Sequence, residues 1–189
     1  MKSPAATSSG RPSAADLAAA HGKHLRDVIG PRLKILFCGI NPGLYSAATG
    51  NHFARPGNRF WPALHAAGFT PRLFQPSEKD TFLRLRYGLT NLVPRATASA
   101  DELEPIEFIA GRARLARKVR RHRPRMVAFL GMGAYRHAFG QPQARLGEQA
   151  QQFEGARVWV LPSPSGLNAS YPMGALVAEL RKLKQALRA

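Results

Sequence analysis

A buried strand that runs directly into a glycine-bounded loop constrains the fold of this chain more than any other feature. Residues 33–38 are apolar except for Lys34, and Gly39-Ile40-Asn41-Pro42-Gly43 follows at once. Apolar runs of this length that end in turn residues are typical of parallel strands within α/β sheets. Because ligands of open α/β sheets bind beyond the carboxyl ends of the strands, Asn41 is predicted to lie at a functional site. The same pattern also fits an ordinary turn between a strand and a loop.

Further apolar runs alternate with helical periodicities along the chain. The segment 39–58 is expected to be a long loop, and loops of that length inside a domain are usually functional or disordered. Strands that alternate with helices predict an α/β fold, a three-layer α/β/α arrangement with a mainly parallel central sheet of four or five strands. Beyond the first strand, strands are expected near 89–93, 126–130 and 157–161, and helices near 14–29, 59–67, 77–86, 101–122, 132–139 and 172–187.

Composition divides the chain into an N-terminal extension and one domain. Residues 1–13 are rich in Ser, Pro, Gly and Ala and have little to bury, which predicts disorder. Residues 1–30 are therefore assigned to a partly disordered extension, and 31–189 to a single domain that is long enough for a real core. No signal peptide and no apolar run of membrane-spanning length is recognised, so we expect a cytoplasmic protein. We also expect it to be a monomer.

The net charge of +17, from 28 Lys and Arg against 11 Asp and Glu, indicates a polyanionic partner, most commonly nucleic acid. The competing partner, a membrane surface, would need a basic amphipathic helix with large apolar anchors, and none is recognised. The basic run within 112–125 is either a solvated helix face or a contact with phosphates. A single cysteine, Cys38, excludes an intrachain disulfide and a Cys-rich metal site, and we expect no metal and no cofactor.

Four motifs stand at predicted strand ends and helix starts: Gly39-Ile40-Asn41-Pro42-Gly43, Pro56-Gly57-Asn58-Arg59-Phe60-Trp61, Gly88-Leu89-Thr90-Asn91-Leu92-Val93 and Pro164-Ser165-Gly166-Leu167. Together they resemble, from about residue 32 onward, the mismatch-specific uracil- and thymine-DNA glycosylases of the uracil-DNA glycosylase superfamily. The resemblance implies a monofunctional DNA glycosylase that flips a uracil opposite guanine out of the duplex and hydrolyses its N-glycosidic bond. The product would be an abasic site for base excision repair, with thymine and other damaged pyrimidines as further candidate substrates.

The resemblance assigns the chemistry to the first motif. Asn41 matches the residue that holds the attacking water, and an amide can orient water but is a poor general base. The reaction would therefore depend on positioning and on stabilisation of the leaving anion. Thr97 is a candidate to help position the water, although a surface-loop hydroxyl is an equal alternative. Ile40 is counted among the residues that bind the base.

Four other residues are expected to bind the flipped base. Phe53 matches the aromatic residue that stacks on the pyrimidine, with a core aromatic as the alternative, and His52 would line the pocket or touch a phosphate. Asn91 offers a donor and an acceptor to a pyrimidine edge. Gly43 stands where strict uracil enzymes carry a tyrosine that blocks a 5-methyl group. Discrimination against normal thymine would then come from the ease with which a mismatched base leaves the duplex.

The last motif is assigned to DNA binding. Leu167 resembles the apolar wedge that fills the gap left by the flipped base, and Ser165, Gly166 and Asn168 would meet the DNA around the widowed guanine. Asn168 replaces a commoner serine, and Ser163 stands where relatives carry asparagine or histidine, so help to the leaving group from this loop is open. The expected partner is double-stranded DNA that contains G·U or G·T mismatches, which would associate the protein with a bacterial nucleoid.

Two functions of other kinds stay open. A non-catalytic DNA-binding protein of the same fold would keep the motifs for damage recognition, but Asn41, Phe53 and Asn91 together weigh against it. A nucleotide-binding enzyme could use the first loop as a phosphate cradle, but that loop lacks the Gly-Lys-Ser/Thr ending of such sites.

Overall fold

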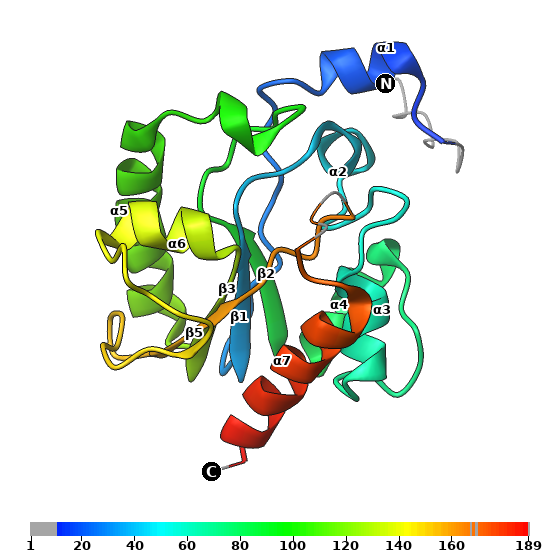
Figure 1. Ribbon diagram of the computed structural model, residues 1–189. Coiled ribbons are helices and arrows are strands. Elements are labelled where there is room, and N and C mark those ends of the chain that lie inside the picture. Colours follow the sequence, from blue (N-terminus) through cyan, green and yellow to red (C-terminus); the bar gives the residue numbers. More distant parts are fainter. Residues whose placement is uncertain (1–10, 167, 169, 189) are drawn as a thin grey trace.

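A five-stranded sheet forms the centre of the protein, for which a computed structural model describes residues 11–166, 168 and 170–188. Figure 1 shows this sheet with helices on both sides. The strand order is β2-β1-β3-β5-β4, and four strands are parallel while β4 pairs antiparallel with β5. The strands are β1 (Ile35–Gly39), β2 (Tyr87–Asn91), β3 (Met126–Leu130), β4 (Gly147–Glu148) and β5 (Arg157–Leu161).

Helices cover both faces of the sheet, which confirms the predicted three-layer α/β/α fold. In Figure 1, α5 and α6 lie on one side of the strands, and α3, α4 and α7 lie on the other. The helices are α1 (Ala14–Ala19), α2 (Leu44–Thr49), α3 (Phe60–Ala66), α4 (Lys79–Arg84), α5 (Pro105–His122), α6 (Met132–Phe139) and α7 (Met173–Ala186), with short 3-10 turns at Pro76–Glu78 and Ala100–Glu102.

Strand β1 is buried on both faces because its side chains alternate between two hydrophobic clusters. Phe37 packs with Phe60 of α3 in an edge-on contact, with ring centroids 5.5 Å apart. Leu36 and Cys38 point to the opposite face, where they join the cluster formed with α5. Two-sided burial explains the nearly continuous apolar sequence of this strand and gives a rigid base to the loop that follows it.

The N-terminal segment differs from the predicted helix at 14–29. Helix α1 begins after a capping box between Ser13 and Asp16 and ends at Ala19. Val28 then pairs with Leu89, and each residue donates its backbone N–H to the other's carbonyl at 2.8–2.9 Å. This pairing lies on the outer edge of β2, and it overrides the helical propensity of the segment. Of the disorder predicted for 1–13, residues 1–10 lie outside the described residues, whereas Ser13 is ordered as the cap of α1. The domain division at residue 30 stays a prediction.

Several predicted boundaries also need correction. The segment 39–58 is not one loop, since it contains α2, which begins after Gly43 and ends at Gly50 in a left-handed conformation with φ of 69°. Strand β2 covers 87–91 rather than 89–93, which places Asn91 at its last position, opposite Gly39. The long helix begins at Pro105 rather than near 101, because proline suits the first helical turn. The short strand β4 was not predicted.

Within the part of the chain that the structure describes, no helix has both the length and the apolarity needed to cross a membrane.

Candidate active site

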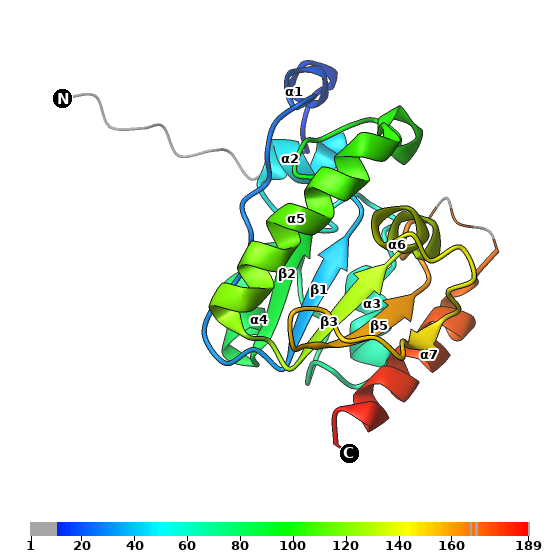
Figure 2. The same cartoon turned by 90° about the vertical axis from the view of Figure 1, so that its left-hand side faces the viewer.

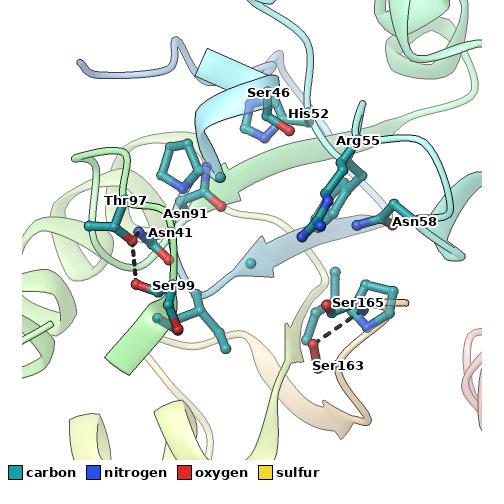
Figure 3. Close-up of a pocket in the computed structure, with 18 of the residues that line it drawn as sticks. Asn41, Ser46, His52, Arg55, Asn58, Asn91, Thr97, Ser99, Ser163 and Ser165 are labelled. Carbon is teal, nitrogen blue, oxygen red and sulfur yellow. Dashed lines mark hydrogen bonds between the residues drawn. The ribbon is translucent and has the colours of Figure 1, made fainter. Parts of the chain in front are cut away.

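A cavity of about 440 Å³ opens at the carboxyl ends of the parallel strands, where the sequence placed the site. Figure 3 shows Asn41, Thr97 and Ser99 together on one side of it, and Ser163 and Ser165 on another. The structure brings most of the predicted site residues to this one cavity. Those that line it are Ile40, Asn41, Gly43, His52, Phe53, Asn91, Thr97, Ser165 and Asn168.

The carboxamide of Asn41 is held in one orientation by the loop that follows β2. Its Nδ2 donates to the Thr97 hydroxyl at 2.7 Å and to the Arg95 carbonyl at 3.1 Å. The Thr97 hydroxyl donates to the Ser99 carbonyl at 2.7 Å, so it accepts from Asn41. Both amide hydrogens are thus used, and Oδ1 makes no hydrogen bond among the described residues. Oδ1 is the acceptor that Asn41 can present to a ligand.

Backbone pairing between β1 and β2 continues beyond the strands and creates this contact. Leu92 donates to the Gly39 carbonyl and Val93 to that of Ile40, each at 2.9 Å, and Thr97 donates to that of Pro42 at 3.1 Å. The two loops therefore run side by side. Thr97 is only 1% exposed, so it is not a surface hydroxyl but a buried support for Asn41.

The side chains of Phe53 and Asn91 both lie close to Gly39, which lines the cavity. A Cβ at position 39 would lie 2.6 Å from Oδ1 of Asn91 and 3.3 Å from the Phe53 ring, so only glycine leaves space for both. Phe53 stacks on Phe60 with centroids 4.0 Å apart, and it keeps a left-handed backbone with φ of 54°. An aromatic ring next to an amide donor and acceptor suits a flat heterocycle with polar edges.

His52 lies deep behind the ring of Phe53 and is 2% exposed. Its Nε2 donates to the Arg26 carbonyl at 2.9 Å, and burial lowers the pKa of the imidazole below its ordinary value, which favours the neutral ring. His52 lines the cavity in this position, and its Nε2 is already used by the Arg26 carbonyl.

Arg59 is a site residue that the sequence analysis did not identify beyond its place in a motif. Its Nη2 donates to the carbonyls of Ser165 at 2.6 Å and Asn168 at 3.1 Å, and its Nη1 donates to that of Tyr171. Its backbone N–H donates to the Pro164 carbonyl at 2.9 Å. One guanidinium group therefore holds three backbone carbonyls of the segment that follows β5.

Gly166 adds a second contact between the same two segments. A Cβ at position 166 would lie 2.7 Å from the Gly57 carbonyl oxygen, so glycine permits this close approach. Gly166 does not line the cavity itself. Asn168 uses its Nδ2 within the loop, where it donates to the Ser163 carbonyl at 3.2 Å. Leu167, the predicted wedge, lies outside the described residues.

The polar side chains that line the cavity carry amides, hydroxyls, one carboxylate, one imidazole and one guanidinium group. Asp101 is the one carboxylate among the described residues that line it, and Arg55 is exposed at its edge. No group of three or more His, Cys, Asp or Glu in the described ranges is placed to hold a metal ion. The arrangement can bind a polar ring and orient a small nucleophile beside it.

Comparison with known proteins identifies the fold and the family of the chain. The protein is similar in fold to a candidate uracil DNA glycosylase from Methanosarcina acetivorans, whose structure was determined by NMR in solution, with a TM-score of 0.56 and 20% sequence identity. The match covers 86% of this chain and 98% of that one. Residues 26–188 match the protein family described as the Uracil DNA glycosylase superfamily. The chain therefore belongs to the uracil DNA glycosylase superfamily, and this membership supports its assignment as a DNA glycosylase, a hydrolase of N-glycosyl bonds.

Proposed function

We propose that the protein is a monofunctional DNA glycosylase that removes uracil mispaired with guanine and leaves an abasic site. Thymine and other damaged pyrimidines opposite guanine are further candidate substrates. The observation that carries the proposal is the fixed amide of Asn41, which presents Oδ1 to the same cavity that Phe53 and Asn91 line. A positioned acceptor beside a ring-binding pocket is what hydrolysis of a base from its sugar requires.

The proposed reaction begins with the base turned out of the duplex into the cavity. The pyrimidine ring lies against Phe53, and the carboxamide of Asn91 bonds its polar edge. A water molecule donates one hydrogen bond to Oδ1 of Asn41. This hydrogen bond orients the water so that a lone pair of its oxygen points at C1′ of the sugar. As the water oxygen bonds to C1′, the bond from C1′ to the base nitrogen breaks, and its electron pair leaves with the pyrimidine anion. The surplus water proton passes to solvent.

The rate enhancement is assigned to position and electrostatics rather than to a strong base. An amide accepts a hydrogen bond but does not take up a proton near neutral pH. The anion that forms on the pyrimidine would be stabilised by N–H donation from Asn91, whose side chain makes no hydrogen bond within the described residues and is 7% exposed.

DNA binding is assigned to the loop that Arg59 holds and to the excess of positive charge. The loop 163–168 borders the cavity, so a duplex over the cavity would meet it. Leu167 is proposed as the wedge that enters the gap left by the flipped base. The charge of +17 predicts that affinity for DNA, bound by the monomer, falls steeply with salt.

The test is a cleavage panel with purified wild-type protein. Duplexes carrying uracil or thymine opposite guanine, uracil opposite adenine, and only normal pairs are incubated and then treated with alkali. The proposal predicts alkali-labile sites at uracil opposite guanine and none in the normal duplex. Binding to the uracil duplex without any alkali-labile site would contradict it and favour a non-catalytic DNA-binding protein.

A further inference from the structure

A second hollow of about 550 Å³ lies at the opposite end of the sheet from the candidate active site. Residues 29–32, which precede β1, and residues 121–123, which precede β3, line it. It therefore opens at the amino ends of the parallel strands, whereas the first cavity opens at their carboxyl ends. Figure 2 shows the end of α5 beside the segment that leads into β1, at the far end of the strands from α2.

Three exposed arginines, Arg32, Arg121 and Arg123, border this second hollow. None of their guanidinium groups forms an ion pair or hydrogen bond with another described residue. Elsewhere on the protein several arginines are engaged, for example Arg157 with Glu148 at 2.7 Å and Arg95 with Glu107 at 2.6 Å. The second hollow therefore concentrates positive charge that the protein itself does not neutralise.

The helix dipole explains only part of this cluster. Cations in the last turn of a helix are favourable, which accounts for Arg121 and His122 at the end of α5. Arg32 and Arg123 lie outside the helix, and both have left-handed backbones, with φ of 54° and 45°. Such positions favour glycine, so a long cationic side chain is not what the backbone alone would select. Neither the helix dipole nor the backbone conformation therefore explains arginine at these two positions.

We propose that this second hollow binds nucleic-acid phosphates and holds a second DNA segment while the first lies over the active site. Guanidinium groups offer paired donors that match phosphate oxygens. Five residues of β1, about 17 Å at 3.3 Å per residue, separate the two sites, and they lie at opposite ends of the sheet. The two hollows open at opposite ends of the strands, so a straight duplex laid across one opening would not lie across the other, and the protein would bridge two segments. This inference rests on the DNA-binding part of the proposed function.

The test uses the full-length protein with Arg32→Gln, Arg121→Gln and Arg123→Gln combined. Glutamine removes the charge and keeps the strain of a non-glycine residue at the left-handed positions. The matched control combines Arg11→Gln, Arg117→Gln and Arg145→Gln, which removes the same charge from exposed arginines outside both cavities. Each protein is loaded on an immobilised duplex, washed, and offered a second, labelled duplex.

The wild type and the control are expected to retain the labelled duplex. The variant with Arg32, Arg121 and Arg123 replaced, called the hollow variant, is expected to retain about one tenth as much of the labelled duplex as the wild type, or less. Its capture should also depend less on salt, by about one unit of slope for each phosphate contact removed. Retention on the immobilised duplex should change little in all three proteins. Equal capture by the hollow variant and the control, or no capture by the wild type, would overturn the inference. If the wild-type protein does not stay bound to the immobilised duplex, the DNA binding in the proposed function is contradicted instead.

Discussion

The amide nitrogen of Asn41 lies 2.7 Å from the hydroxyl oxygen of Thr97, and this contact decides which end of the carboxamide faces the cavity. Since Thr97 donates its own hydrogen to Ser99, it can only accept from Asn41. The amide is thereby turned so that its oxygen is offered to a ligand. Asn41 cannot serve as a strong base, but it can still orient a water molecule because its one acceptor atom is fixed in place.

Replacement of Thr97 by valine should disturb this orientation while it preserves the shape of the side chain. Nδ2 of Asn41 would then keep only the Arg95 carbonyl as an acceptor. We expect the single-turnover rate of uracil excision to fall by up to about 100-fold with little change in DNA affinity. Thr97→Ser should recover most of the rate because it restores the hydroxyl. A Thr97→Val protein as fast as the wild type would show that the hydroxyl has no positioning role.

Gly39→Ala should close the pocket for the base. The new Cβ would meet Oδ1 of Asn91 at 2.6 Å and the ring of Phe53 at 3.3 Å, so one of them has to move. We expect kcat/KM for the uracil duplex to fall by about 100-fold, as a misplacement of about 1 Å can cost. Gly133→Ala in α6 is the matched control, since a Cβ there meets nothing within 4 Å. Similar kinetics for Gly39→Ala and Gly133→Ala would contradict the proposal that Gly39 leaves space for Phe53 and Asn91 in the pocket.

Arg59→Lys should loosen the loop 163–171 although the positive charge remains. An ammonium group is a point charge and does not reproduce the fork that reaches three carbonyls. Each such hydrogen bond contributes about 1.5–3 kcal/mol. We expect faster hydrogen exchange of the loop amides and weaker DNA binding. Arg117→Lys on the exposed face of α5 should change neither, and an unchanged loop in Arg59→Lys would refute this role.

The ring of His52 should titrate below its ordinary pKa of 6.5, because burial disfavours the charged form. Below pH 6.5 the unfolded chain takes up a proton before the folded chain does, so acidification destabilises the fold. The stability contributed by the neutral ring is present above 6.5 and is lost as pH falls through the folded pKa. NMR titration of the ring measures this directly. Titration at or above 6.5 would show that the ring is not buried in solution.

The sequence predicted the central layer well because two-sided burial leaves a strong signal. Strands β3 and β5 match the predictions at 126–130 and 157–161, and β1 ends at Gly39 beside the predicted motif. The helix expected at 14–29 failed because Val28 pairs with Leu89, a contact across 61 positions that local propensity does not contain. Helix α2 was missed because it is only six residues long and has no side-chain cap.

The sequence could predict the site residues whose side chains are identified by motifs. It could not predict a residue such as Arg59, whose hydrogen-bond acceptors are backbone carbonyls. Asn41 and Asn91 stand in recognisable motifs, the family resemblance points to Phe53, and the structure brings all three to one cavity. The role of Arg59 was not visible, because its acceptors are main-chain carbonyls, which every residue carries. Only the folded path of the loop shows that Ser165 and its neighbours meet this guanidinium.

The account depends on the Asn41 side chain as the holder of the nucleophile, and single-turnover excision of uracil opposite guanine tests it most directly. Asn41→Ala should lower the rate by about 10²–10⁴-fold and leave DNA affinity nearly unchanged. Asn51→Ala is the matched control, because among the described residues the side-chain amide of Asn51 bonds only the Thr49 carbonyl, and Asn51 lies outside the cavity. We expect normal excision by Asn51→Ala and almost none by Asn41→Ala. Equal rates for the two variants would contradict it.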